Sequence, residues 1–269
     1  MSKFTFGFIG CGNMGGALAR ASAKALTADH LAVCDTDPAK TAAFVKASLA
    51  TAVELVEIAK ESQYLFLAVK PQGLDKVMEQ IAPILKARND SYVLVSMAAG
   101  VSISRLEELA PQGCPIIRIM PNTPVSVGEG MIVYDTNSAV TEDQLQGFLK
   151  GLTAAGCLDR LSESLIDAAG ALSGCGPAFV YLFAEAMADG GVACGLPRDK
   201  AMTYAARTLL GAAEMLLTTG QHPGQLKDAV CSPGGTTIAG VHALESGAFR
   251  CDVMNAVMAA YEKTQKLKS

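Results

Sequence analysis

The stretch Phe4-Thr-Phe-Gly-Phe-Ile-Gly-Cys-Gly-Asn-Met-Gly15 decides the fold class of this sequence. An apolar run of strand length, residues 4–9, leads directly into the pattern G-x-G-x-x-G, and a helix-compatible segment follows it. A strand, this loop and a helix, in that order, open the βαβ unit of dinucleotide-binding folds. In such a unit Gly10 permits the tight turn, Gly12 leaves room for a pyrophosphate, and Gly15 lets the helix pack closely against the strand.

The same loop is the first candidate site. A helix N-terminus supplies amide donors and the positive end of a dipole, and both suit phosphate groups. We therefore predict that this segment binds the pyrophosphate of a nicotinamide dinucleotide, with a glycine-rich turn that holds no ligand as the alternative. The predicted cofactor-binding residues here are Ile9, Gly10, Cys11, Gly12, Asn13, Met14 and Gly15.

Compact apolar runs alternate with helix-compatible segments through the first half of the chain. Continuous apolar runs of this kind are typical of parallel strands that are covered on both faces. We expect strands at residues 4–9, 31–34, 65–69, 92–96, 116–120 and 131–134, and helices at 17–26, 39–47, 53–60 and 73–85. The predicted fold class is α/β, with an N-terminal doubly wound parallel sheet of the Rossmann type.

The second half loses this strand pattern from about Leu161 onward. Residues 201–217 are apolar on nearly every side of a helix, and such a helix needs cover all round. We predict a dinucleotide-binding domain over residues 1–160 and an all-α domain over residues 161–269. Because the second domain is small, a second copy of the chain is the expected source of that cover, which predicts a homodimer.

The overall composition excludes several classes of protein. The 269 residues are 50% hydrophobic and 18% charged, which excludes general disorder. Lys and Arg number 22 against 26 Asp and Glu, so no basic excess favours a nucleic-acid partner. The uncharged run 168–184 approaches the length of a short membrane span, but its glycines and Pro177 favour a buried helix and no membrane partner.

The cysteines and the N-terminus predict where the protein works. The eight cysteines are scattered without a C-x-x-C pair, and the three histidines lack partners at metal-ligand spacing. We therefore expect reduced thiols and no metal. Because residues 1–4 enter an apolar strand without a signal-peptide pattern, we expect a cytoplasmic protein.

Asp35 ends the second expected strand, twenty residues after Gly15. An acid at this place usually accepts a hydrogen bond from a ribose 2′-hydroxyl and repels a 2′-phosphate. A turn over residues 35–38 is an equally good interpretation, because Asp-Thr-Asp-Pro has turn chemistry. Taken alone, this residue favours NADH over NADPH.

Further motifs identify a family. Ala68-Val-Lys-Pro71 and Met120-Pro-Asn-Thr-Pro124 each close a predicted strand. Ser173-Gly-Cys-Gly-Pro-Ala178 and the long segment His222-Pro-Gly-Gln-Leu-Lys-Asp-Ala-Val-Cys-Ser-Pro-Gly-Gly-Thr-Thr-Ile238 lie in the helical half. In this order, over essentially the whole chain, they resemble the pyrroline-5-carboxylate reductase family, which catalyses the last step of proline synthesis.

The resemblance implies an NAD(P)H-dependent oxidoreductase that reduces the cyclic imine L-1-pyrroline-5-carboxylate to L-proline. It implies intertwined dimers, which some members arrange into larger rings. Members commonly use NADPH, often with a polar or basic residue where this chain has Asp35, so the choice between NADPH and NADH stays open. Strand ends border the ligand crevice of such a sheet, so the remaining expected cofactor contacts are Ala68, Val69, Lys70, Pro71 and Asn122. For Lys70 the alternative is a solvated charge at a strand end.

The segment 232–238 is the candidate substrate site. We interpret it as a helix start in which Ser232 caps, Pro233 occupies the first turn and the glycines expose amides. Such a start can bind a carboxylate, which the implied substrate carries. The expected substrate-binding residues are Ser232, Gly234, Gly235, Thr236 and Thr237. By the resemblance, the Thr237 hydroxyl orients the imine nitrogen and relays a proton, so Thr237 is the expected catalytic residue.

Two alternatives remain. A β-hydroxyacid dehydrogenase has a similar architecture, but it needs a lysine one turn beyond a glycine-rich motif, and none occurs here between Gly176 and Lys200. A dinucleotide-sensing module without turnover would keep the loop at Gly10 but would not need the segment 232–237.

Overall fold

The computed structural model describes residues 2–266 and contains one sheet of eight strands in the order β3-β2-β1-β4-β5-β6-β7-β8. From β1 to β6 the neighbouring strands are parallel, whereas β7 runs antiparallel to β6 and β8 runs parallel to β7. The strands are β1 Phe4–Ile9, β2 Leu31–Cys34, β3 Thr51–Ala52, β4 Ser62–Leu67, β5 Val93–Ser96, β6 Ile116–Met120, β7 Gly130–Thr136 and β8 Gly156–Arg160. The strand order reverses between β1 and β4, and ligands of such sheets bind outside the carboxyl ends of the strands at that point.

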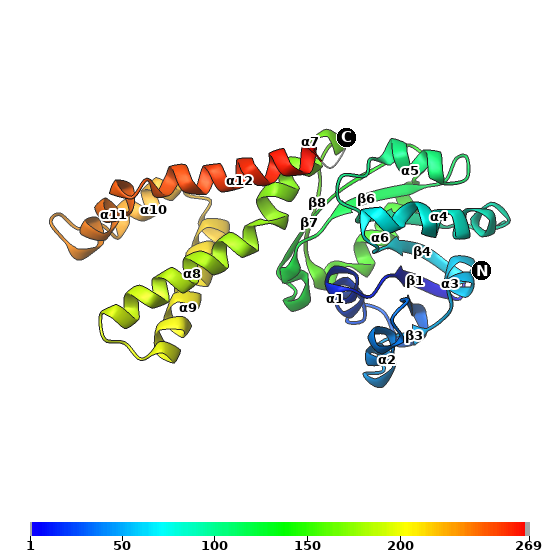
Figure 1. Cartoon of the computed structure of the whole chain (residues 1–269), viewed down its shortest axis with the longest axis horizontal. Coiled ribbons are helices and arrows are strands. Elements are labelled where there is room, and N and C mark those ends of the chain that lie inside the picture. The colour runs from blue at the N-terminus through cyan, green and yellow to red at the C-terminus, as the bar shows by residue number, and fades with distance from the viewer. Residues whose placement is uncertain (1, 267–269) are drawn as a thin grey trace. The chain divides into compact units, whose positions relative to one another are not determined.

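Helices cover both faces of this sheet (Figure 1). One face packs against α1 Asn13–Ser22, α2 Pro38–Lys46 and α6 Glu142–Gly151, with Phe8 and Phe66 stacked at its centre. The other face packs against α3 Leu55–Glu61, α4 Pro71–Lys86 and α5 Ile103–Leu109. Because both faces are buried, the strands read as continuous apolar runs, which is the pattern that predicted them.

The predicted α/β fold with a doubly wound sheet is confirmed, with two differences in detail. The strand β7 is antiparallel to β6, because the short connection between them, which contains the 3-10 turn η2 Thr123–Val127, is too short for a parallel crossover. The sequence prediction missed β3 and β8. The first has two residues, and the second is a half-exposed edge strand that ends in Asp159 and Arg160, so neither has an apolar run.

Buried charges attach α7 Glu163–Ala169 to this sheet. Arg118 of β6 is 2% exposed and donates to Glu163 Oε1 at 3.0 Å and to Asp167 Oδ1 at 2.6 Å. Glu163 Oε1 also accepts from the Ile103 amide at 2.6 Å. Removing one partner of a buried ion pair leaves an uncompensated charge, so these contacts fix where α7 lies.

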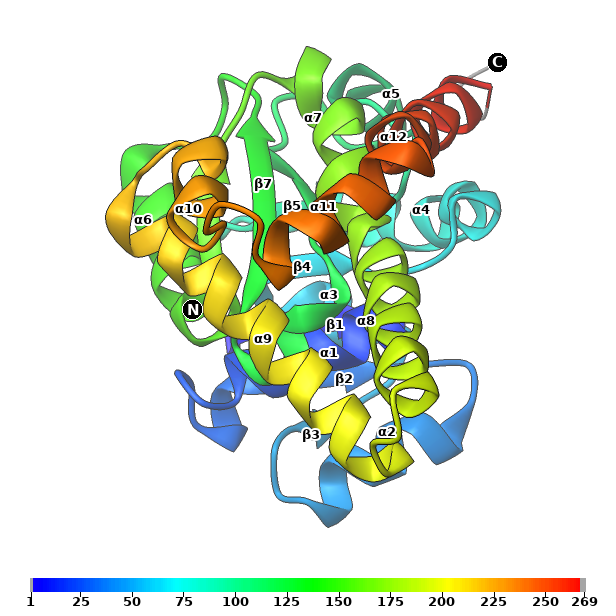
Figure 2. The ribbon, with the colours of Figure 1, turned by 90° about the vertical axis from the view of Figure 1, so that its left-hand side faces the viewer.

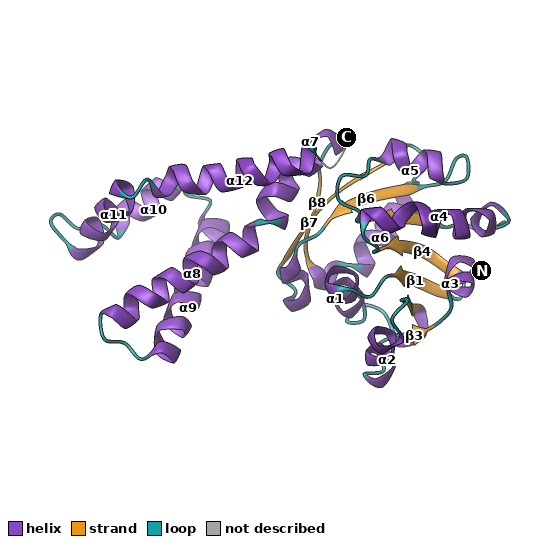
Figure 3. Ribbon diagram, in the orientation of Figure 1, coloured by secondary structure: helices purple, strands orange, loops and turns teal. Residues whose placement is uncertain are grey.

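The helical half contains no strand among the described residues after β8 (Figure 3). A π-helical turn, η4 Gly170–Gly174, follows α7. The later helices are α8 Gly176–Ala193, α9 Arg198–Thr219, α10 Pro223–Ala229, α11 Thr236–Ser246 and α12 Phe249–Gln265. Figure 2 shows α8 and α9 as a pair, which packs through Ala188, Ala201 and Ala205.

Contacts divide the chain into two compact units. The sheet unit comprises the residues up to Cys175 together with α12 from Ala260 onward, and the helical unit comprises Gly176–Ala259. This division differs from the expected boundary between residues 160 and 161, because the buried pairs of Arg118 keep α7 with the sheet.

The helical unit buries little of its apolar surface within one chain. The exposed fractions are 68% for Leu182, 56% for Leu210 and 83% for Leu217. The expectation of a buried helix over residues 168–184 is therefore not met in a single chain. Among the described residues, one helical run, Glu163–Ala193, is long and apolar enough to cross a membrane by length and composition alone.

Candidate functional site

The glycine loop after β1 occupies the point where the strand order reverses. Gly10 has φ +101°, and its amide donates to the carbonyl of Cys34 at 2.8 Å. A Cβ on Gly10 would lie 2.5 Å from the Ala68 carbonyl oxygen, and one on Gly15 would lie 2.2 Å from the Gly10 carbonyl oxygen. Both glycines are therefore required by the protein's own backbone.

Gly12 is different. It lies at the N-cap of α1, and a Cβ there would meet no atom of the described residues within 4 Å. The fold itself thus leaves space at Gly12, beside first-turn amides that have no intrahelical acceptor. An anionic group that approaches the backbone closely fits this space, and the contact of residues 9–15 with a dinucleotide pyrophosphate stays a prediction.

Asp35 holds this loop. Its Oδ2 accepts from the Cys11 amide at 2.7 Å, and its Oδ1 accepts from the Asp37 amide at 2.9 Å and from Lys40 Nζ at 3.5 Å. Burial by itself would raise the pKa of this carboxyl, but the two amide bonds and Lys40 outweigh it, so the pKa lies below its ordinary value. The side chain is an anion that is 7% exposed and both oxygens of which are engaged.

These contacts combine the two interpretations of Asp35. It forms the predicted turn with Asp37, and it also lies at the carboxyl end of β2 where a ribose contact was predicted. The sequence did not predict its bond to the Cys11 amide, because no pattern in residues 11 and 35 signals it.

The thiol of Cys11 lies beside this carboxylate. Burial of the thiol, followed by the charges of Asp35 and Cys34, raises the pKa of Cys11 to about 12, so this thiol stays neutral.

The motif Ala68-Val-Lys-Pro71 lies beside the glycine loop. The Ala68 amide donates to the carbonyl of Ile9 at 2.8 Å, which joins the ends of β4 and β1. Lys70 is exposed at the N-cap of α4, and Pro71 is the first residue of that helix. The motif therefore lies at the same edge of the sheet as residues 10–12, and its contact with a cofactor stays a prediction.

Asn122 follows β6 at the same edge of the sheet and is 8% exposed. Its Oδ1 accepts from the Met131 amide at 2.9 Å, and its Nδ2 donates to the Ser173 carbonyl at 3.0 Å. Both ends of this side-chain amide are thus engaged with the protein. The prediction that Asn122 contacts the cofactor did not anticipate these bonds; Pro177, four residues after Ser173, is the signal that was overlooked.

The segment 232–237 belongs to the helical unit, and one expectation about it is wrong. Ser232 does not cap the helix: α11 begins at Thr236 with Gly235 as its N-cap. Residues 232–235 instead form a turn in which the Gly235 amide donates to the Ser232 carbonyl at 3.0 Å. Pro233 and Gly234, with φ +65°, occupy the central positions, as in a type II turn, so the turn and not a ligand requires Gly234.

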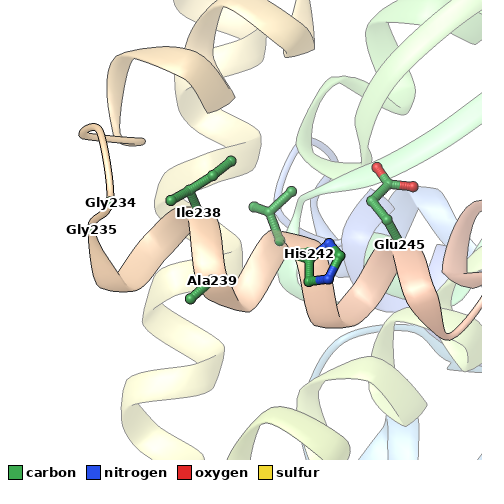
Figure 4. A pocket seen from close by; sticks show the side chains of 7 residues that line it. Gly234, Gly235, Ile238, Ala239, His242 and Glu245 are labelled. Carbon is green, nitrogen blue, oxygen red and sulfur yellow. The ribbon is translucent and has the colours of Figure 1, made fainter.

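The start of α11 is nonetheless suited to an anion. No side chain of residues 2–266 caps it, and its first-turn amides, which include those of Thr236 and Thr237, have no intrahelical acceptor. A shallow groove of about 530 Å³ runs from this start along the helix (Figure 4). Its lining is Gly234, Gly235, Ile238, Ala239, Val241, His242 and Glu245.

The structure thus brings the predicted cofactor residues together in the sheet unit and the predicted substrate residues together in the helical unit. Within the described part of the chain no cluster of His, Cys, Asp and Glu is arranged to hold a metal ion. The glycine loop and the segment 232–237 supply amide donors, the latter segment also supplies hydroxyls, and Lys70 supplies an exposed ammonium group. This set of groups suits anionic ligands.

Comparisons with protein families match both parts of the chain. A family described as pyrroline-5-carboxylate reductase dimerisation matches residues 163–267. A family described as NADP oxidoreductase, coenzyme F420-dependent, matches residues 5–100.

Curated relatives match the full length. A pyrroline-5-carboxylate reductase of Pisum sativum is 40% identical over 267 residues, which are 98% of this chain and 96% of the relative. One of Methanosarcina acetivorans is 39% identical over 270 residues, 99% of each chain. Pyrroline-5-carboxylate reductase 2 of Homo sapiens is 43% identical over 270 residues, 98% of this chain and 83% of the relative.

Solved structures agree. A Plasmodium falciparum pyrroline carboxylate reductase with NADP bound superposes with a TM-score of 0.89 at 35% identity, and each chain is covered to 100%. A pyrroline-5-carboxylate reductase of Coxiella burnetii gives the same TM-score and the same coverage at 31% identity.

Proposed function

The chain belongs to the pyrroline-5-carboxylate reductase family, and we propose from this premise that it reduces L-1-pyrroline-5-carboxylate to L-proline. It is an oxidoreductase that acts on a carbon–nitrogen bond and depends on a nicotinamide dinucleotide. The observation that carries the proposal is the full-length identity of about 40% to reductases of this name. The two helix starts that no side chain caps, at Gly12 and at Gly235, fit a dinucleotide and a carboxylate substrate.

The sheet unit would hold the cofactor. The amides of residues 10–15 would receive the pyrophosphate and Asp35 would contact the adenosine ribose. Ala68, Val69, Lys70 and Pro71 would contact the cofactor at the same edge of the sheet, with the loop of Asn122 further along it. When bound there, the reduced nicotinamide supplies a hydride.

The helical unit would hold the substrate. First-turn amides of α11 at Thr236 and Thr237 bind the carboxylate, and the turn of Ser232, Gly234 and Gly235 sets the direction of that helix start. The Thr237 hydroxyl then contacts the ring nitrogen, which is attached to the same carbon as the carboxylate. As the imine carbon accepts the hydride, the nitrogen gains one proton, which the hydroxyl relays unless the nitrogen is already an iminium.

The choice of cofactor depends on the surroundings of Asp35. A relative of 35% identity was solved with NADP bound, which supports NADPH. The Asp35 carboxylate supports NADH, but two amides and Lys40 partly compensate its charge. We propose that both cofactors are accepted and that Asp35 weakens the binding of NADPH.

We further propose a homodimer formed by the helical unit, and rings of dimers as a larger assembly. The match of residues 163–267 to a dimerisation family and the exposed leucines of α8 and α9 support the dimer. The apolar run Glu163–Ala193 would then be covered by a second copy and not by a membrane. We propose no nucleic-acid partner, because a net charge of −4 leaves no basic excess to neutralise phosphates.

We propose that the enzyme works in the cytoplasm. All eight cysteines lie in the described residues and are free thiols, which is the state kept by a reducing compartment. Cell fractionation followed by the reductase assay tests this proposal, and activity recovered in a membrane or secreted fraction would contradict it.

One assay separates the proposed reaction from its alternatives. The purified chain is mixed with NADPH or NADH, and absorbance of the reduced nicotinamide is followed after addition of pyrroline-5-carboxylate. The proposal predicts consumption of the reduced cofactor and formation of proline. A β-hydroxyacid dehydrogenase would instead reduce NAD(P)⁺ with a hydroxyacid, and a sensing module would bind the cofactor without turnover.

A further inference from the structure

The side chain of Asn122 joins segments that lie far apart in the sequence. It leaves the carboxyl end of β6, accepts from the Met131 amide at the start of β7, and donates to the Ser173 carbonyl in the π-helical turn η4. It is 8% exposed, so both hydrogen bonds are shielded from water. Breaking one of them leaves a buried backbone group without its partner.

The Ser173 carbonyl needs this donor because of Pro177. In an α-helix the amide of residue 177 would donate to the carbonyl of residue 173, but proline has no amide hydrogen. The chain just before this point is already wound as a π-helix, with the Cys175 amide bonded to the Gly170 carbonyl at 3.1 Å. Asn122 Nδ2 therefore takes the place of a donor that the helix lacks.

The hydrogen bond between Asn122 and Ser173 lies next to the proposed cofactor site. The loop of Asn122 lies at the carboxyl edge of the sheet, and the following turn η2 packs against α1, the helix of the cofactor site. On the other side, Gly170 of η4 is so close to Met120 that a Cβ would lie 3.2 Å from Met120 Cγ. Ser173 lies two positions before Cys175, where the first of the two segments of the sheet unit ends.

We propose that Asn122 is a positioning residue, which fixes the turn η4 to the loop beside the cofactor site by donating to the Ser173 carbonyl, to which Pro177 cannot donate. The chain continues from this attachment into the unit that carries Thr237. The loop of Asn122 lies beside the proposed cofactor site, so a shift of this loop disturbs the position of the bound cofactor and lowers the rate of hydride transfer. A misplacement of about 1 Å can cost up to roughly 100-fold in rate. This inference rests on the proposed function.

The test is a double-mutant cycle of Asn122→Ala and Pro177→Ala in the full-length enzyme. Asn122→Ala should lower kcat by about 10- to 100-fold and reduce Tm by several degrees. It should change the Kd of NADPH, measured by fluorescence titration, by less than about threefold, since the phosphate loop keeps its contacts. Pro177→Ala supplies an amide for the Ser173 carbonyl, so the loss in Tm caused by Asn122→Ala should shrink in that background while the loss in kcat persists.

Asn137→Ala is the matched control. Asn137 likewise accepts from the Ile116 amide at 3.0 Å and donates to the Cys114 carbonyl at 2.9 Å, with a further bond to Glu107 Oε1 at 3.0 Å, but it lies beside the amino end of β6. Its replacement should lower Tm without lowering kcat. If Asn122→Ala does not fold, Pro177→Ala alone decides, because it competes for the Ser173 carbonyl and should lower kcat at unchanged or higher Tm.

Three results would overturn the inference: an unchanged kcat in Asn122→Ala, a kcat that recovers together with Tm in the double variant, or a rise in the Kd of NADPH that matches the loss of kcat. The last result would make Asn122 a cofactor contact. The unaltered enzyme is assayed first, and a failure of this enzyme to reduce pyrroline-5-carboxylate would contradict the proposed function instead.

Discussion

At the scale of single residues, we propose that the hydroxyl of Thr237 carries the protein's part in proton transfer. It is the second residue of α11, beside amides that no side chain of the described residues caps. A carboxylate held by those amides brings the attached ring nitrogen within reach of this hydroxyl. Thr236 precedes it in the same helix turn but points in another direction, because successive residues of a helix are about 100° apart.

Thr237→Ala should reduce kcat/KM for pyrroline-5-carboxylate by about 10²–10³, the effect of losing one well-placed donor to a group whose charge changes. Steady-state kinetics with both substrates measure this. The control Thr236→Ala should cost much less, and the cofactor KM should hardly change in either variant. Near-normal turnover of Thr237→Ala would assign proton delivery to water.

Asp35 anchors the glycine loop, and one substitution can separate this role from the proposed repulsion of a 2′-phosphate. Asp35→Asn keeps the shape and an acceptor for the Cys11 amide but removes the charge beside the expected 2′-phosphate. Because Lys40 and two amides already compensate that charge, we expect the lower end of the electrostatic effect, about 1 kcal/mol, or roughly a fivefold rise in the ratio of kcat/KM for NADPH to that for NADH. Asp35→Ser should shift the ratio in the same direction and also raise both KM values, since the loop loses its anchor. If the ratio of kcat/KM for NADPH to that for NADH stays constant, Asp35 anchors the glycine loop and does not affect the choice of cofactor.

Among the elements, the turn before α11 requires a conformation that only glycine adopts easily. Gly234 has φ +65°, and a side chain there costs about 1–2 kcal/mol. Gly234→Ala should therefore raise the KM for pyrroline-5-carboxylate by roughly 5- to 30-fold, because the first-turn amides lose their direction. Gly113→Ala imposes the same strain, at φ +75°, in the sheet unit and should lower Tm alone. Equal KM values in the two variants would show that the turn does not set the substrate site.

A second contact between elements, that of Arg88 with Asp90, contributes to the stability of the fold in acid. Arg88 joins α3, β4 and the loop before β5 through bonds to the carbonyls of Ala59 and Ser62 and to Asp90. Its guanidinium lowers the pKa of Asp90 from 3.8 to about 2 against the opposing effect of burial. The folded pKa lies below the unfolded one, so this stabilisation is complete above about pH 4 and is lost as the pH falls towards 2.

Thermal melts at pH 2 to 5 test this contact. Tm of the unaltered protein should fall more steeply in that range than Tm of Asp90→Asn, whose carboxamide does not titrate. At pH 6 the variant should be the less stable of the two. Parallel curves would show that Asp90 contributes nothing through its charge.

At the scale of the whole molecule, the helical unit has too small a core to stand alone. Its buried apolar cluster consists of Ala188, Ala201 and Ala205, whereas leucines of α8 and α9 are exposed. Exposed apolar patches of this kind mark interaction surfaces. A homodimer in which each copy covers the other explains why these helices are apolar on nearly every side.

Leu210→Glu on α9 should therefore yield monomers that are inactive and unfold at lower temperature, whereas Val56→Glu, at a comparably exposed position of α3, should leave the dimer intact. Analytical ultracentrifugation measures the mass of both, and of the unaltered enzyme at sub-micromolar concentration. A stable, active monomer of the unaltered enzyme would contradict the obligate dimer.

Local rules determine much of this protein. The order of strand, G-x-G-x-x-G and helix predicted the α/β fold and the cofactor loop, because a tight turn and a close backbone approach need glycine at those places whatever surrounds them. The apolar runs 4–9, 31–34 and 116–120 became β1, β2 and β6 without change. The stretch 201–217, which is apolar on nearly every side, became part of the helix α9, as its helical spacing predicted.

Only the tertiary structure decided which groups meet. Whether Asp35 binds the Cys11 amide, whether Asn122 reaches Ser173, and whether Arg118 keeps α7 with the sheet depend on segments brought together by strand order. The cap of α11 is a smaller case of the same kind: Ser232 has a good capping side chain, but Pro233 and Gly234 favour a turn that places Gly235 at the cap. Periodicity and motifs specify each segment through its own backbone preferences, whereas a polar side chain takes the partner that burial leaves within reach.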